Sequence, residues 1–128
     1  MKRFWIAAGA LVVTLAALAV AMLLGSASFD FGRYSRHQAR LAKVMREQPT
    51  ADRLTRGFAD EGTILLAVAR TPEEVEREAA TRGGHKAAEI REKGARSAEM
   101  RVYQAADMLY FIYFDKDGVM RDFTLVSR

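Results

Sequence analysis

The feature that most constrains this chain is the uncharged stretch Phe4–Leu24, which is 21 residues long. A helix of that length spans about 31 Å, close to the thickness of the hydrocarbon core of a bilayer. Ten of its residues are Leu, Ile, Val or Phe, and each of these favours insertion by roughly 0.3 to 0.6 kcal/mol. Lys2 and Arg3 form a basic flank before it. We therefore expect a single transmembrane helix over residues 4–24, acting as a signal anchor.

The same stretch has a second interpretation as a cleavable signal peptide, because basic residues precede it and small residues follow it. Cleavage would then leave a chain that begins at Ser28. If the helix is retained, the basic flank at residues 1–3 favours a membrane protein whose C-terminal domain lies outside the cytoplasm. Ala17, Ala21 and Gly25 recur at four-residue spacing, which would let two such helices pack closely as a homodimer. In so alanine-rich a segment this spacing also arises easily, and the alternative is that these alanines face lipid.

The rest of the chain has room for one small domain. About 100 of the 128 residues follow the span, and this is the size of a single domain. We expect a linker over residues 25–34 and a small α+β domain over residues 35–128. The chain contains no cysteine, which excludes disulfides, thiolate zinc sites and a lipid anchor on cysteine.

Basic side chains gather just after the predicted span, at Arg33, Arg36, Arg40 and Lys43. Near a membrane surface, each basic residue adds about 1 kcal/mol of attraction to anionic lipids. These residues are therefore candidates for headgroup contacts, and the alternative is an ordinary solvated helix face. Counted as flanking charges, they favour the opposite topology, with the domain in the cytoplasm.

Several short helices are predicted in the first part of the domain. Residues 35–48 carry a narrow apolar stripe, and Thr50 is placed to cap a second short helix. Thr71-Pro72-Glu73-Glu74 combines an N-cap, a proline at the first helical position and a capping-box glutamate. It predicts a helix that runs to about Arg82. A further helix is predicted over residues 86–93.

Strands are predicted in the last part of the domain, with one before them. The uniformly apolar stretch at 63–69 predicts a buried strand, with a helical turn as the alternative. The C-terminal residues predict a three-stranded antiparallel meander over 98–104, 108–114 and 119–126. The turn Asp115-Lys116-Asp117-Gly118 between the last two strands is typical of a hairpin.

The pairing of the three strands decides which side chains share a face. Placing Gln104 opposite Met108, and Phe114 opposite Val119, gathers nonpolar side chains on one face. That face contains Met100, Val102, Met108, Tyr110, Ile112, Phe114, Val119, Phe123 and Leu125. We therefore expect the helices to pack on one face of the meander, with a fourth strand at 63–69 as a further option.

The opposite face of the predicted meander is half apolar. It would expose a patch larger than a single surface hydrophobe, which makes it a candidate surface for a protein partner. The patch consists of Arg101, Tyr103, Leu109, Phe111 and Tyr113. The alternative is that the fourth strand or a helix covers part of it.

No group of residues indicates catalysis or a metal site. His37 and His85 are the only histidines, and neither has a partner at metal-ligand spacing. Asp115, Asp117 and Gly118 match part of a calcium loop, but its first and last ligand positions fall on residues without carboxylates. The arginine-rich segment lacks interleaved aromatic residues, so nucleic-acid binding is not expected. We expect no cofactor and no metal.

Two short stretches resemble a known family. Thr71-Pro72-Glu73-Glu74-Val75 is similar to a helix-opening T-x-x-E-V, and Tyr113-Phe114-Asp115-Lys116-Asp117-Gly118-Val119 is similar to a hairpin F-D-x-x-G-x-V. With helices placed before three antiparallel strands, the chain resembles the αα-βββ module of the SmpA/OmlA outer-membrane assembly lipoproteins and the related β-lactamase-inhibitor-like fold. The resemblance implies an envelope-facing scaffold that binds protein partners and catalyses nothing.

Together these observations predict a single-pass, membrane-anchored interaction or accessory module that has a protein partner and no enzymatic activity. The first alternative is a cleaved, exported domain that binds a ligand or inhibits an enzyme. The second is a small enzyme, which would need a cleft lined by carboxylates such as Glu89, Glu92 or Asp107.

Overall fold

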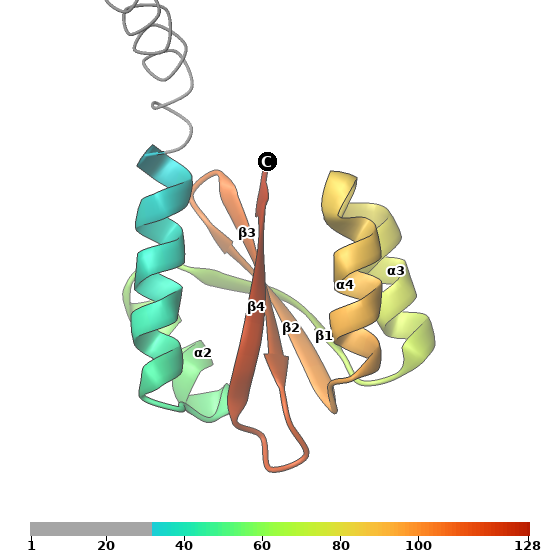
Figure 1. The fold of residues 1–128 in the computed structure, drawn as a ribbon. Helices are drawn as coiled ribbons and strands as arrows, with labels where there is room; N and C mark the ends of the chain where they lie inside the picture. Colours follow the sequence, from blue (N-terminus) through green and yellow to red (C-terminus); the bar gives the residue numbers. More distant parts are fainter. Residues whose placement is uncertain (1–31) are drawn as a thin grey trace, which may run out of the picture. The chain divides into compact units, whose positions relative to one another are not determined.

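The computed structural model describes residues 32–128, whose helices and four-stranded antiparallel sheet confirm the α+β class (Figure 1). A helix covers residues 32–46 and is called the 32–46 helix below. The other elements are α2 (Ala51–Asp60), β1 (Ile64–Ala69), α3 (Pro72–Arg82), the 3₁₀ helix η1 (Gly84–Lys86), α4 (Ala87–Ala95), β2 (Glu99–Ala105), β3 (Met108–Phe114) and β4 (Met120–Ser127).

The predicted membrane segment falls outside the described residues. This applies to the flank at 1–3, to the transmembrane helix at 4–24 and to most of the linker at 25–34. Residues 32–34 of that linker are already helical. Within the described part of the chain, no helix combines the length and the apolar character that crossing a bilayer requires.

Two helices begin where the local sequence predicts. The Thr50 hydroxyl accepts a hydrogen bond from the Arg53 backbone N–H at 3.4 Å and caps α2. The Thr71 hydroxyl accepts from the Glu74 N–H at 3.2 Å, and Pro72 occupies the first position of α3. The predicted caps and the extent of α3 are confirmed.

The four strands form one antiparallel sheet in the order β1-β2-β3-β4. The stretch predicted as a strand at 63–69 is β1, so the fourth strand is confirmed. It pairs with β2, and the register shifts at a bulge between Leu65 and Ala67. β1 and β4 are therefore the two edge strands.

The β2–β3 hairpin differs from the predicted register by one residue. Its turn contains only Ala106 and Asp107, so Ala105 pairs with Met108, where the sequence predicted Gln104. The tight turn requires Ala106 to adopt a φ of +55°, in the region that glycine usually supplies. The longer loop expected from the sequence is therefore absent from this hairpin.

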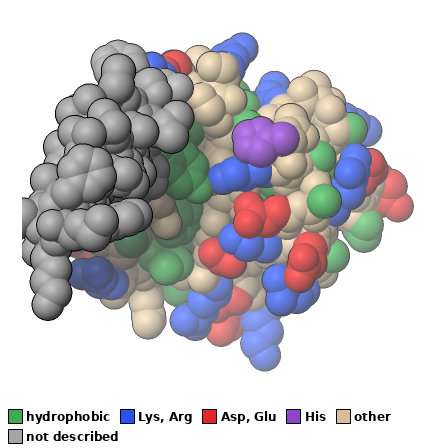
Figure 2. Space-filling view, turned by 45° about the horizontal axis from the view of Figure 1, so that its top comes forward, with side chains coloured by type: hydrophobic (Ala, Val, Ile, Leu, Met, Phe, Trp, Pro, Cys, Tyr) green, Lys and Arg blue, Asp and Glu red, His purple; other side chains and the backbone are tan. Residues whose placement is uncertain are grey.

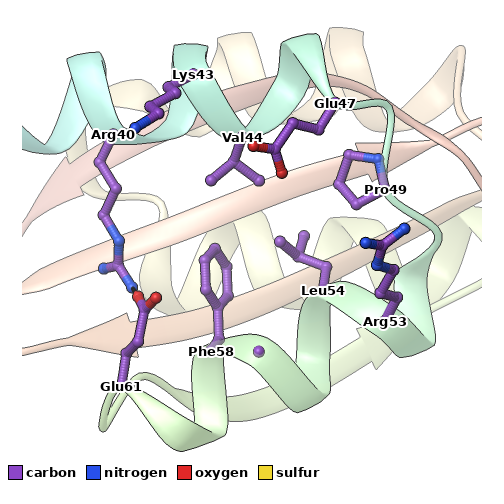
Figure 3. A pocket seen from close by; sticks show the side chains of 10 residues that line it. Arg40, Lys43, Val44, Glu47, Pro49, Arg53, Leu54, Phe58 and Glu61 are labelled. Atoms are coloured by element: carbon purple, nitrogen blue, oxygen red, sulfur yellow. Dashed lines mark hydrogen bonds and ion pairs between the residues drawn. The ribbon is translucent and has the colours of Figure 1, made fainter.

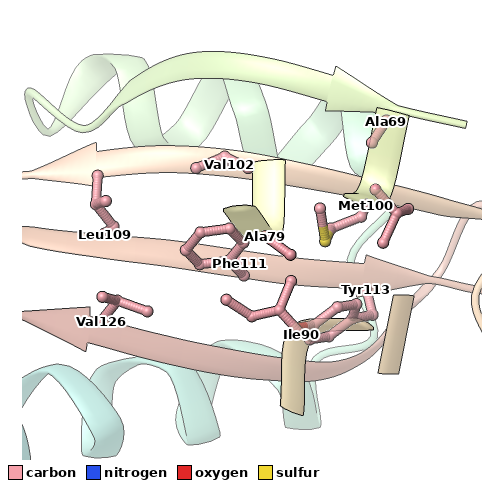
Figure 4. Packing of buried hydrophobic residues seen from close by; sticks show 10 residues of the cluster. Ala69, Ala79, Ile90, Met100, Val102, Leu109, Phe111, Tyr113 and Val126 are labelled. Atoms are coloured by element: carbon pink, nitrogen blue, oxygen red, sulfur yellow. The ribbon is translucent and has the colours of Figure 1, made fainter. Parts of the chain in front are cut away.

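This one-residue shift places β2 side chains on the other face of β3. Met100 lies opposite Tyr113, and Val102 lies opposite Phe111. These side chains join a core beneath α3 and α4 (Figure 4). Its buried members are Ala69, Val75, Ala79, Ile90, Met100, Val102, Leu109, Phe111, Tyr113 and Val126.

The β3–β4 hairpin has the predicted Asp-Lys-Asp-Gly turn, but its register differs by one residue at Phe114 and by two residues beyond a bulge between Tyr113 and Phe114. Ile112 pairs with Phe123, where the sequence predicted Arg121. Val119 bridges Thr50 at the start of α2 instead of pairing with β3. Beyond the bulge, the shift by two residues keeps each β4 side chain on its predicted face. Next to the turn, Met120 takes the place opposite Phe114 that was predicted for Val119.

Helices cover both faces of the sheet, which corrects the expectation that they pack on one face only. Figure 1 shows the helix that ends at residue 46 together with α2 on one side, and α3 with α4 on the other. On the first side, Phe58 of α2 packs edge to face on Tyr103 of β2, with ring centroids 5.1 Å apart. Leu41 of the 32–46 helix is fully buried. All seven residues of β3 are buried between the two helical layers.

Candidate functional site

The five residues predicted to form an exposed partner surface are buried, with at most 8% of each exposed. They also lie on two different faces of the sheet. Arg101 and Tyr103 contact α2. Leu109, Phe111 and Tyr113 belong to the core beneath α3 and α4. The expectation of an exposed patch is therefore corrected, because the register shift and the second helical layer both take these residues inside.

Arg101 is the centre of a polar cluster that joins α2 to β2. Its Nε donates to Glu99 at 2.8 Å, its Nη1 to Thr55 Oγ1 at 2.9 Å and its Nη2 to Asp52 at 3.2 Å. Thr55 Oγ1 also shares a hydrogen bond with the Tyr103 hydroxyl at 2.7 Å. Burial acts to lower the pKa of Arg101, but Glu99, Tyr103 and Asp52 together outweigh it and raise that pKa above its ordinary value. The guanidinium therefore stays charged and holds α2 in place.

The four basic residues predicted to contact headgroups lie on the 32–46 helix. Arg36 and Lys43 are exposed, Arg33 is half-buried, and Arg40 turns inward. Headgroup contact by these side chains stays a prediction.

Arg40 connects the 32–46 helix to the sheet and to the residues after α2. Its Nη1 donates to the Tyr110 hydroxyl at 3.1 Å and to Thr63 Oγ1 at 3.3 Å, and its Nη2 pairs with the Glu61 carboxylate. The guanidinium carbon lies 4.9 Å from the centre of the Phe58 ring, within cation–π range. Burial raises the pKa of Tyr110 above its ordinary value, although the hydrogen bond from Arg40 acts in the opposite direction. Arg40 is thus fixed by several partners at once.

A groove of about 380 Å³ opens between the 32–46 helix and α2 (Figure 3). This volume lies within the range of ligand pockets, roughly 300 to 1,000 Å³. Val44, Leu54 and Phe58 supply apolar walls, and Figure 3 shows them pointing toward one another across the gap. The Arg40–Glu61 ion pair closes one end.

The rim of the groove carries more positive than negative charge. Lys43 and Arg53 are basic and Glu47 is acidic, and none of the three has an ion-pair partner within residues 32–128. The Arg40–Glu61 pair is neutral as a whole. Two cations against one carboxylate favour an occupant that brings negative charge.

Gly57 lines the groove from within α2. It is exposed, and no atom lies within 4 Å of the place where a Cβ would be. A glycine inside a helix costs roughly 0.8 to 1 kcal/mol relative to alanine. Alanine would fit at this position, and only a larger side chain would occupy the groove. The groove was not predicted from the sequence, and a glycine inside a helix is the signal that could have pointed to it.

Acidic and basic side chains are interspersed over much of the described surface, as Figure 2 shows for one face. Glu89 pairs with Lys93 at 3.9 Å and Glu92 pairs with Arg96 at 3.4 Å, both along α4. Glu89 and Glu92 thus share α4, whereas Asp107 lies in the β2–β3 turn. Within residues 32–128, no three His, Cys, Asp or Glu side chains are grouped to hold a metal ion.

Each of the two histidines has a different setting. His85 lies exposed in η1, and His37 shares a hydrogen bond with the buried Tyr110 hydroxyl through Nδ1. Every buried polar side-chain atom of the described residues has a hydrogen-bond partner.

Comparisons with protein-family models, with curated proteins and with solved structures found no match to this chain. The resemblance to the SmpA/OmlA module therefore stays a prediction.

Proposed function

We propose that this chain is a single-pass, membrane-anchored interaction module without catalytic activity. Its domain binds an acidic, amphipathic segment of a partner protein in the groove between the 32–46 helix and α2. The apolar stretch at residues 4–24 is the anchor, and the domain lies outside the cytoplasm.

The groove is the observation that carries this proposal. The half-buried Val44 and the small exposed parts of Leu54 and Phe58 give the groove an apolar lining. A partner's nonpolar side chains would be buried against this lining, at roughly 25 cal/mol per Å². Lys43 and Arg53 offer positive charge at the rim. An amphipathic helix with one apolar and one acidic side would match both features, since a groove between two helices is a recurrent docking site for such a segment.

The Arg40 cluster supports the groove in its open form. Because Arg40 is held by Glu61, Thr63 and Tyr110, the end of the groove is ordered before any partner arrives. Preorganisation of this kind lowers the entropic cost of binding.

A crosslinking experiment on the full-length chain tests the site. A small diazirine-bearing amino acid is placed at position 57, which lines the groove, or at position 56, which is exposed on α2 but does not line it. In washed membranes of expressing cells, we expect a discrete adduct with one other protein from position 57 and none from position 56. Recovery of the chain in the washed membranes tests the anchor in the same sample.

A matched pair of variants then tests whether the groove itself is occupied. With the photoreactive group at position 47, Gly57→Trp fills the groove, whereas Gly57→Ala adds a single methyl group and leaves it open. We expect Gly57→Trp to reduce the adduct about tenfold, equivalent to about 1.4 kcal/mol of binding free energy, and Gly57→Ala to leave it unchanged. Equal adducts from the two variants, or from positions 56 and 57, would show that the partner binds elsewhere.

The volume of the groove also favours a second candidate function. In that case the apolar stretch is cleaved, and the exported domain binds a small amphiphilic ligand in the same groove. An intact mass that corresponds to a chain beginning at Ser28, together with loss of the chain from washed membranes, would support this second candidate and reject the anchor.

A further inference from the structure

β1 presents an open edge. It pairs with β2 on one side, and no strand of the described residues pairs with its other side. The strand sequence Ile64–Ala69 is uncharged along its whole length and contains no proline. Ile64 is 63% exposed and is the large hydrophobic side chain that stands out on the described surface. An edge with these properties is a ready template for another strand.

The opposite edge of the sheet is protected. β4 carries Arg121 and Asp122 in its first half. Arg121 pairs with Asp115 at 2.6 Å, and Asp122 pairs with Lys93 of α4 at 3.4 Å. Charged side chains on an edge strand hinder the addition of a further strand. The same protection is absent from Ile64–Ala69, which makes β1 the edge that accepts a partner.

The two ends of β1 carry opposite charges. Asp60 and Glu61 precede the strand, and Arg70 follows it, with 61% of the Glu61 side chain and 67% of the Arg70 side chain exposed. Within the chain, Glu61 pairs with Arg40, and Arg70 pairs with Glu99 at 2.7 Å. Ion pairs with this much exposed surface contribute little energy, so both side chains can also interact with a neighbouring molecule. When two copies of β1 pair in antiparallel orientation, the acidic end of each lies beside the basic end of the other. Parallel pairing would instead bring like charges together, so the charges select the antiparallel arrangement.

We propose that β1 pairs in antiparallel orientation with β1 of a second copy of this chain, which joins two four-stranded sheets into one continuous sheet. The contact is isologous, so each favourable contact between the strand ends is made twice. The bulge between Leu65 and Ala67 interrupts the ladder locally. We therefore expect the pairing between copies to be short.

The absence of cysteine from the chain makes this pairing directly measurable. Single cysteines are introduced at each position from 64 to 68 of the full-length chain, and membranes are treated with a mild oxidant. Disulfides form only where two Cα atoms approach within about 7 Å. We expect covalent homodimers that peak at one or two adjacent β1 positions. Ser127→Cys on β4 and Ala80→Cys on α3, both exposed, should give no dimer above background.

An edge-blocking variant separates this contact from dimerisation by other parts of the chain. Ile64→Lys places a charge on the edge, whereas Ile64→Thr keeps an uncharged, β-branched residue there; the site is exposed, so both variants should fold. In an Ala67→Cys or Val68→Cys background, we expect Ile64→Lys to reduce the disulfide dimer at least about tenfold and Ile64→Thr to change it little. The proposal would be overturned if Ile64→Lys left the yield of dimer unchanged. It would also be overturned if Ser127→Cys crosslinked equally well, or if the β1 cysteines formed adducts with a different polypeptide.

Discussion

At the scale of single residues, Asp115 organises the turn between β3 and β4. Its Oδ1 accepts hydrogen bonds from the backbone N–H groups of Asp117 at 2.9 Å and Val119 at 3.0 Å, and its Oδ2 accepts from Arg121 Nε at 2.6 Å. The hydrogen bond from Arg121, with those from the backbone, holds the pKa of the Asp115 carboxyl below its ordinary value of 3.8. Gly118 completes the turn with a φ of +76°.

This shifted pKa predicts a pH dependence of stability. Since the folded pKa of Asp115 lies below the unfolded value, its carboxylate stabilises the fold above about pH 4, and that contribution is lost as the pH falls through the folded pKa. We expect Asp115→Asn to be less stable than the parent at neutral pH, and the difference to shrink as the solution is acidified below about pH 4. Urea unfolding of the parent and of Asp115→Asn, repeated from neutral pH to below about pH 4, measures this difference in the free energy of unfolding. Asp117→Asn is the control, because the Asp117 carboxylate makes none of the turn's hydrogen bonds. A gap that stays constant on acidification would contradict this linkage.

At the scale of elements, the packing of α3 against α4 depends on a close approach at Gly94. A Cβ built at Gly94 would overlap Val75 Cγ1 of α3 and would lie 3.3 Å from Val75 Cγ2. The Val75 Cβ lies at 3.5 Å, which is ordinary contact. Valine is branched at Cβ and has little freedom to turn away. The two helices therefore fit together only because position 94 has no side chain.

Replacing Gly94 by alanine should therefore destabilise the domain, although alanine is the better helix former. We expect a cost of about 1 to 3 kcal/mol from overpacking. In the presence of Val75→Ala, the same replacement should cost almost nothing further, because both offending methyl groups are gone. Gly57→Ala is the matched control, since its Cβ meets nothing within 4 Å, and it should stabilise α2 by about 0.5 to 1 kcal/mol. Denaturant unfolding of the four variants forms a double-mutant cycle. Additive costs for Gly94→Ala and Val75→Ala would exclude the clash as the cause.

The elements also show which parts of the fold the sequence could predict. The caps at Thr50 and Thr71 and the turn at Asp115 were predictable because neighbouring residues determine them. The β2–β3 register was not, because the turn at Ala106 contains no glycine to mark its length. β3 is nonpolar at every position, so there was no alternation of polar and nonpolar residues to show which side chains share a face. A continuous nonpolar strand is typical of a strand buried on both faces, and this signal pointed to the second helical layer.

The groove was harder to predict because it depends on two helices at once. Leu54 and Phe58 have the spacing of an ordinary core stripe, and both are buried. The opening next to them is lined by Gly57 on one helix and by Val44 on the other. Only the packing of the two helices brings Lys43 and Arg53 to the same rim.

At the scale of the whole described domain, the 32–46 helix is part of the core rather than an arm between membrane and domain. Leu41 has no exposed surface, and Arg40 bonds to Tyr110 of β3 on the sheet face that α2 also covers. The helix begins at residue 32, eight residues after the end of the predicted span, and it also forms one side of the groove. A change that loosens this helix should therefore affect both the stability of the domain and binding in the groove.

Leu41→Ala tests this integration. If the helix is a core layer, deleting the buried side chain should cost about 2 to 5 kcal/mol, the range for large-to-small replacements in a packed core. A helix that only linked the domain to the membrane would lose less than about 0.5 kcal/mol, as surface substitutions do. Gln38→Ala, at an exposed position of the same helix, should change stability by less than that amount. Pulse proteolysis of the full-length chain in increasing urea gives the free energy of unfolding without removing the anchor. Because the helix forms one side of the groove, Leu41→Ala should also weaken binding there. We expect a weaker adduct from position 57 at urea concentrations where the parent chain is still folded.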